Sequence, residues 1–157
     1  MKELCQKRIE ECYQVAENYF CREFDRPSIE FSRRMTSCAG KAFLGENKIR
    51  LSEPLLLENG MNFVSRTPAH EAAHLIAYRV FGDRGHGTGW KCIMHLLGQE
   101  ASRCHSYEVA GGEKYISDCG KEMSLSKIRH NKLQSGKVEY YYFKKSNVRL
   151  YSRNHVK

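Results

Sequence analysis

The segment from Thr67 to Ala77 contains the pattern His-Glu-x-x-His, formed by His70, Glu71 and His74, within an otherwise apolar run. Residues four positions apart lie on the same face of an α-helix, so both imidazoles can reach one ion without a bend in the backbone. This spacing is typical of zinc enzymes in which the two histidines are metal ligands. The segment therefore predicts a helix that presents His70 and His74 to one Zn²⁺ ion.

A catalytic zinc ion usually has a third protein ligand and keeps one position for water. We favour His86, because the flanking Gly85 and Gly87 let the backbone approach a metal closely. Glu108 is the main alternative, since a glutamate distant along the chain completes other zinc peptidase sites. The remaining candidates after the helix are Asp83, His95, Glu100 and His105.

Glu71 directly follows the first expected ligand, a position at which zinc peptidases carry their general base. We expect Glu71 to take a proton from a zinc-bound water, which then attacks the carbonyl of a peptide bond. The pattern thus predicts a zinc-dependent metallopeptidase with one Zn²⁺ per chain and a protein as its substrate. Tyr107 and a backbone amide of the strand at Gly40 are the candidate donors to the oxyanion, and the sequence does not choose between them.

Apolar periodicity and turn residues predict a mixed α+β fold. Pro68 lies inside one expected helix, which we predict either to start or to kink there. After Gly112 the chain becomes polar, aromatic and basic, so we expect residues 1–112 and 113–157 to form separate regions, the second with two or three strands. The expected helices cover residues 3–24, 52–59, 62–81 and 90–97, and the expected strands cover 28–33, 42–44 and 48–51.

Cysteine usage and hydropathy indicate a cellular compartment. The seven cysteines are odd in number and form no Cys-x-x-Cys pair, which is typical of reduced thiols rather than of a secreted disulfide scaffold. No apolar run reaches the roughly 18 residues of a membrane helix, and the N-terminus lacks an apolar signal core. We therefore expect a cytoplasmic protein that does not associate with a membrane.

The formal net charge of +8 is concentrated at the end of the chain. Residues 121–157 contain ten Lys and Arg but two Asp and Glu, together with several tyrosines. Basic side chains bind phosphates and aromatic faces stack on exposed bases, so this region could bind DNA or RNA. The alternative is a solvated basic face with the tyrosines in a small core. The candidate contacts are Lys127, Arg129, Lys132, Lys137, Lys144, Lys145 and Arg149.

Five segments of the chain resemble motifs of one enzyme family and occur in the same order as in that family. They are Thr36-Ser37-Cys38-Ala39-Gly40-Lys41-Ala42, Ile49–Asn59, Pro68-Ala69-His70-Glu71-Ala72-Ala73-His74, Gly85-His86-Gly87-Thr88-Gly89-Trp90-Lys91 and Arg129-His130-Asn131-Lys132. Together they resemble the SprT-like family of zinc metallopeptidases. The segment around His86 resembles the family's third-ligand segment, which implies His86 as the third ligand.

The resemblance implies a zincin-like fold in residues 1–112, with the active helix near the N-terminal helix and a short strand group beside the cleft. Relatives in animals, the Spartan proteases, cut proteins that are crosslinked to DNA. We expect the chemistry of the family to hold for this chain, because the matches include the ligands and the general base. The biological substrate does not follow from a shared fold.

The sequence departs from the family in its last third. The family often ends in a zinc ribbon with two cysteine pairs. Here Cys119 keeps one position of the first pair and Ser117 takes the other, while Phe143 and Ser146 stand at the positions of the second pair. A structural zinc needs four good ligands, which Cys119 and His130 alone cannot supply. We therefore expect a degenerate ribbon without a second zinc, held together by apolar contacts.

Two other functions remain to be weighed against a peptidase. One is a nucleic-acid-binding protein with a structural or vestigial zinc site. Such a site does not need a general base, so the presence of Glu71 argues against it. The other is a zinc hydrolase with a non-protein substrate, since His-Glu-x-x-His also serves deformylases. The long spacing to His86 and the collinear family segments argue against this last alternative.

Overall fold

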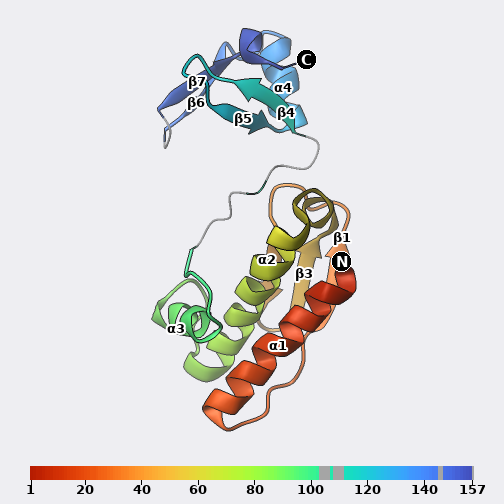
Figure 1. Cartoon of the computed structure of the whole chain (residues 1–157), viewed down its shortest axis with the longest axis vertical. Helices are drawn as coiled ribbons and strands as arrows, with labels where there is room; N and C mark the ends of the chain where they lie inside the picture. Colours follow the sequence, from red (N-terminus) through yellow and green to blue (C-terminus); the bar gives the residue numbers. More distant parts are fainter. Residues whose placement is uncertain (103–106, 108–111, 145–146, 157) are drawn as a thin grey trace. The chain divides into compact units, whose positions relative to one another are not determined.

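The structure is a computed structural model that describes residues 1–102, 107, 112–144 and 147–156. The chain divides into two compact units, residues 1–107 and 108–157. Helices and short strands occur in both, so the architecture is α+β (Figure 1).

The N-terminal helix α1 (Lys2–Phe20) packs along helix α2 (Glu53–Phe81) (Figure 1). The buried side chains of α1 recur at helical spacing on one face, as expected for an amphipathic helix. The helix ends earlier than residue 24, because Cys21 adopts a left-handed conformation with φ 51°. The buried residues of this face are Cys5, Ile9, Cys12, Tyr13 and Ala16.

Helix α2 carries the His-Glu-x-x-His pattern and begins at a side-chain cap. Ser52 is the N-cap, and its hydroxyl accepts a hydrogen bond from the backbone N–H of Leu55. The backbone departs from helical angles at Gly60 (φ 51°, ψ −127°), between the two helices expected over 52–59 and 62–81, whereas the expected start or kink at Pro68 is wrong. Glycine adopts these angles without the steric penalty of a Cβ, whereas Pro68 only removes one N–H from a buried helix.

Three strands, β1 (Ser28–Ser32), β2 (Gly40–Phe43) and β3 (Lys48–Ser52), form a sheet in the order β1-β3-β2. The central β3 is parallel to β1 and antiparallel to β2, and Gly40 lies opposite Leu51. Leu51 is fully buried, and the sheet packs on α2. Strand β2 therefore runs at the edge of the sheet beside the helix that carries the histidines.

Helix α3 (Thr88–Leu96) follows a glycine-rich loop and packs against α2. Its buried residues are Trp90, Ile93 and Met94, and these positions share one helical face. The loop between α2 and α3 is thereby anchored at both ends, which fixes the position of His86.

The second unit contains two antiparallel hairpins and a helix, so the expectation of two or three strands is wrong. The helix α4 escapes sequence analysis because it buries a single residue, Leu133, and has no apolar stripe. A small apolar core holds the unit together, formed by Tyr115, Leu125, Leu133, Val148 and Leu150. The elements are β4 (Glu113–Ile116), β5 (Glu122–Leu125), α4 (Lys127–Gln134), β6 (Tyr140–Phe143), β7 (Val148–Tyr151) and the 3₁₀ turn η1 (Ser152–Asn154).

The six cysteines within the described residues are free thiols. Among the described helices, none combines the length and the apolar character that a bilayer-spanning segment needs.

Candidate metal centre

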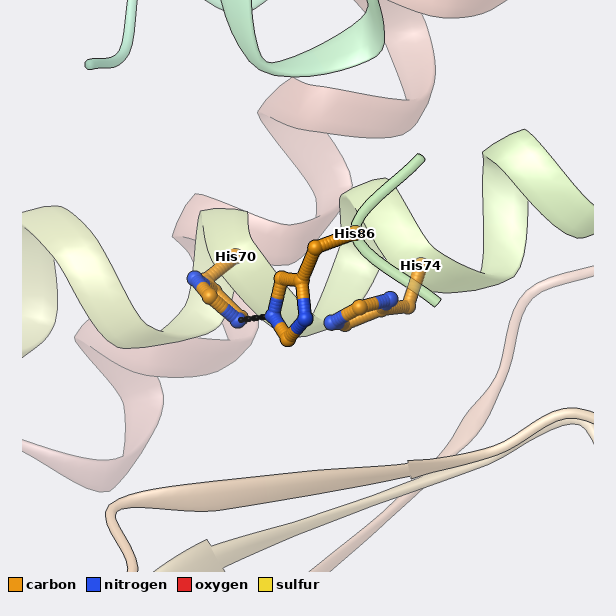
Figure 2. A group of neighbouring side chains, drawn as sticks. All are labelled: His70, His74 and His86. Carbon is orange, nitrogen blue, oxygen red and sulfur yellow. Dashed lines mark hydrogen bonds between the residues drawn. The ribbon is translucent and has the colours of Figure 1, made fainter. Parts of the chain in front are cut away.

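Three imidazoles converge above helix α2. His70 and His74 project from the same face of α2, and His86 reaches them from the loop before α3 (Figure 2). The Nε2 atoms of His70 and His86 lie 3.1 Å apart. One ligand nitrogen from each histidine lies within 4.8 Å of the other two, a spacing that a single ion can bridge.

The chemistry of this donor set fits zinc. Burial and the neighbouring His86 lower the pKa of His74 to about 4, so its imidazole is neutral near pH 7. A neutral imidazole is the form that binds a metal. Three histidine nitrogens and one further coordination position are a usual ligand set for catalytic zinc. The residues present therefore fit a Zn²⁺ ion held by His70, His74 and His86.

Trp90 supports all three rings from the first turn of α3. It is fully buried, and its ring centroid lies 4.9 Å from that of His70, 5.4 Å from that of His74 and 4.5 Å from that of His86. The indole N–H also points at the carbonyl of His70, with 3.5 Å between the nitrogen and the oxygen. The indole limits the orientations available to each imidazole, because packed rings cannot rotate freely.

Asp83 holds the loop that carries His86. Its carboxylate accepts hydrogen bonds from the backbone N–H of Gly85 at 3.1 Å and of Trp90 at 3.2 Å. These N–H groups lower the pKa of Asp83, first Gly85 and then Trp90. Asp83, one of the candidate third ligands, thus acts on the loop backbone and does not belong to the histidine group.

Glu71 lies on α2 beside the histidines and faces strand β2. The residue is 6% exposed, and this burial raises the pKa of Glu71 to about 8. The hydrogen bond from the backbone N–H of Ala42 lowers the pKa, but its effect is smaller. A cation at the histidines would favour the ionised carboxylate, because opposite charges lower a carboxyl pKa. The structure therefore places a carboxylate at the same site as the three imidazoles.

An open cavity of about 560 Å³ lies over this site. Residues of β2 form one wall, and residues of helix α2 form another. Tyr107, a candidate oxyanion donor, lines the cavity, and its hydroxyl lies 2.8 Å from that of Thr67. The residues of the cavity wall that concern the site are Gly40, Lys41, Ala42, Thr67, His70, Glu71, His74, His86 and Tyr107.

The other candidate ligands lie elsewhere or are not described. His95 is exposed on α3, and Glu100 pairs with Arg66 at 3.6 Å. His105 and Glu108 lie outside the described residues. Among the described candidates, only His86 joins His70 and His74.

The basic residues expected to contact nucleic acid belong to the second unit. The described ones are all exposed, and Lys145 lies outside the described residues. The guanidinium of Arg149 on β7 lies over two rings of β6, 5.0 Å from the centroid of Tyr140 and 5.9 Å from that of Tyr142. Lys127, Arg129 and Lys132 are on α4, Lys137 follows α4, and Lys144 follows β6.

Sequence reasoning missed the supporting role of Trp90 and of Asp83. Trp90 is the single tryptophan of the chain, and it follows the His86 loop, which is a signal that could have been used. Asp83 had a detectable signal as well, since an aspartate directly after a helix-ending glycine often hydrogen-bonds to nearby backbone N–H groups. The strand at Gly40 was expected beside the cleft, but its direct packing on Glu71 had no local signal in the sequence, because that contact depends on sheet pairing.

Comparison with known proteins identifies relatives of this chain. The family model described as SprT-like family matches residues 9–110, which include the three histidines and Glu71. Protein SprT of Pseudomonas putida strain W619 is 40% identical over 145 residues, covering 87% of this chain and 88% of its own length. Protein SprT of Pasteurella multocida strain Pm70 is 38% identical over 153 residues, covering 92% and 90%. No solved structure matches. The chain therefore belongs to the SprT-like family.

Proposed function

We propose that this protein is a zinc-dependent metallopeptidase of zincin-like fold. The observation that carries the proposal is the convergence of His70, His74 and His86 beside the buried carboxyl of Glu71 in one open cavity. A purely structural zinc is usually enclosed by four protein ligands, whereas this group offers three and opens to a cavity. The free thiols are compatible with a reducing cytoplasm, where we expect the enzyme to act.

Each residue of the site has a separate role in the proposed peptide hydrolysis. A zinc ion bound there would act as a Lewis acid that would polarise the carbonyl of the peptide bond and would lower the pKa of a water molecule to about 7. His70, His74 and His86 hold the ion, and Glu71 accepts the proton of the attacking water and passes it to the leaving amine. Ala42 orients the Glu71 carboxylate through its backbone N–H. This arrangement supports general base catalysis by Glu71.

A peptide is the substrate class that best fits the walls of the cavity. Within the part of the chain that the structure describes, strand β2 pairs only with β3, and its residues Gly40, Lys41 and Ala42 line the cavity. An extended peptide can add to such an edge through main-chain hydrogen bonds. A cavity bordered by a strand edge therefore favours a polypeptide over a small metabolite.

The test is hydrolysis of an unfolded protein such as casein by the zinc-loaded chain and by Glu71→Gln. We expect the variant to keep its zinc and to lose activity by about 10²-fold or more, because it lacks the general base. Glu58→Gln, an exposed position on the same helix, is the matched control and should retain activity. Unchanged turnover by Glu71→Gln would refute the proposed role.

A second candidate function, nucleic-acid binding by the second unit, has one specific observation in its favour. Tyr140 and Tyr142 are exposed on the same face of β6, and Arg149 lies over both rings. Exposed aromatic faces beside a cation suit single-stranded nucleic acid. We expect fluorescence anisotropy to show binding of single-stranded DNA that weakens steeply between 50 and 200 mM salt and is reduced in Arg149→Ala. A binding curve independent of salt would argue for a merely solvated basic face.

A further inference from the structure

The second unit contains another group of metal-ligating side chains. Glu113 of β4, His130 of α4 and His155 after η1 each offer one ligand atom, and these atoms all lie within 4.8 Å of one another. The rings of His130 and His155 have their centroids 4.6 Å apart. The three residues are far apart along the chain and are brought together by the fold of this unit.

The backbone holds His155 beside the first strand of the unit. Tyr115 and His155 form an isolated antiparallel bridge, and the N–H of Val156 donates to the carbonyl of Lys114 at 2.9 Å. The Nε2 atom of His155 then lies 3.0 Å from Oε2 of Glu113. The position of His155 is therefore fixed by main-chain contacts.

A buried tyrosine orients the other imidazole. The hydroxyl of Tyr115 lies 2.9 Å from Nδ1 of His130, and the side-chain amide of Gln134 donates to the same hydroxyl at 3.3 Å. Histidines that bind metals usually have their second ring nitrogen hydrogen-bonded in this way, which fixes the tautomer. The Tyr115 contact leaves Nε2 of His130 available as a ligand.

The geometry and donor chemistry suit a transition metal. In a tetrahedral zinc site with bonds near 2.0–2.1 Å, neighbouring ligand atoms are about 3.3 Å apart. The 3.0 Å between His155 and Glu113 is close to that spacing. Two imidazoles and one carboxylate are a known ligand set for zinc and for other divalent ions.

We propose that Glu113, His130 and His155 bind a second divalent transition-metal ion. This set differs from the cysteine ribbon whose loss led us to expect no second zinc. Cys119 is not part of the group, and its thiol instead lies 3.2 Å from the hydroxyl of Ser117. The second ion does not depend on the proposed peptidase function.

The small core of the unit gives such an ion a structural purpose. Within the described part of residues 108–157, the buried apolar cluster has five members. Units of this size often need a metal or disulfides, because a small core leaves little net stability. A metal that binds only the folded unit adds its binding free energy to stability.

The test uses the full chain with the cleft ligands removed by the double substitution His70→Ala, His74→Ala. After dialysis against a chelator, Co²⁺ is titrated and its visible d–d absorption is followed. We expect saturation at one equivalent of Co²⁺ in this variant and at two in the native chain. Adding His155→Ala should abolish the remaining band, and circular dichroism should show that the variant is folded.

Two controls separate this site from other binding. His95→Ala in the same double variant, which removes an exposed histidine of α3, should keep the one equivalent. Retention of the ion after His155→Ala would mean that thiols or other groups hold it, and would overturn the proposal. The absence of stoichiometric Co²⁺ binding in the double variant would also overturn the proposal, and the contact between His155 and Glu113 would then be a hydrogen bond without a metal. This test does not measure peptidase activity. Its result therefore stays valid even if the proposed peptidase function is wrong.

Discussion

The backbone of Gly40 on β2 approaches the side chain of Glu71 on α2 so closely that a Cβ at Gly40 would lie 2.6 Å from Cγ and Oε1 of Glu71. Real Cβ atoms essentially never approach another atom this closely. The glycine therefore lets the edge strand pack directly on the proposed general base. It also lets the nearby N–H of Ala42 hydrogen-bond to the carboxylate.

We predict that Gly40→Ala displaces the Glu71 carboxylate and lowers kcat. A shift of about 1 Å in a reacting group can reduce the rate by about 10²-fold, and zinc content should remain near that of the native chain. The measurement is casein hydrolysis with metal analysis of the same samples. Gly45→Ala is the matched control, since an added Cβ there has no neighbour within 4 Å. Equal activity of both variants would contradict the close approach.

Trp90 should report metal binding in the cleft through its fluorescence. It is the single tryptophan of the chain, and it contacts all three histidine rings. We expect Cu²⁺ or Co²⁺ to quench its emission with one equivalent in His155→Ala, and a chelator to restore it. The variant His70→Ala, His74→Ala should show no such saturable quenching. If quenching persisted in that variant, the ion would lie elsewhere.

Removal of the Asp83 carboxylate should weaken zinc binding although Asp83 is not among the ligands. Asp83→Ala deletes the acceptor for the N–H groups of Gly85 and Trp90, so the His86 loop loses its fixed shape. Loss of such a supporting contact costs about 10–100-fold in metal affinity. Competition with a chromophoric chelator gives the affinity. Asp83→Asn keeps one oxygen acceptor and should lie between the native chain and Asp83→Ala.

The contact between Glu17 and Arg26 should make stability sensitive to acid. Hydrogen bonds from Arg26 and from the backbone N–H of Phe24 lower the pKa of Glu17 from 4.5 to about 2. Because the folded state favours the carboxylate, this contribution is present above about pH 4.5 and is lost as the pH falls toward 2. Glu17→Gln should therefore lower the melting temperature at pH 7, by roughly 2–4 °C, and less at pH 3.

The control for this pH series is Glu23→Gln, which removes an exposed carboxylate near the same helix end. Its melting temperature should follow that of the native chain at each pH. A difference between Glu17→Gln and the native chain that stayed constant from pH 7 to pH 3 would contradict the assigned role of Glu17.

Several elements could be predicted because their signals are local. The apolar stripe of α1, the serine cap at Ser52 and the terminal Gly82 are read from neighbouring residues, and the structure has helices at these places. Helix α4 could not be predicted, since it is polar around most of its surface and buries only Leu133. The break at Gly60 agrees with the expected end of one helix at residue 59 and the start of the next at 62, whereas the expected start or kink at Pro68 is wrong, because a proline can be tolerated in a packed helix.

The sequence by itself determined the pair His70 and His74 with Glu71, because the helical repeat alone places residues i and i+4 on one face. Only the tertiary structure brings the favoured third residue, His86, to this pair, since the return of the loop to α2 depends on the packing of α3 through Trp90. The same holds for Glu113, His130 and His155, which have no common spacing and meet through strand pairing and helix packing. Local periodicity fixes neighbours on one element, whereas contacts between elements depend on how the whole core packs.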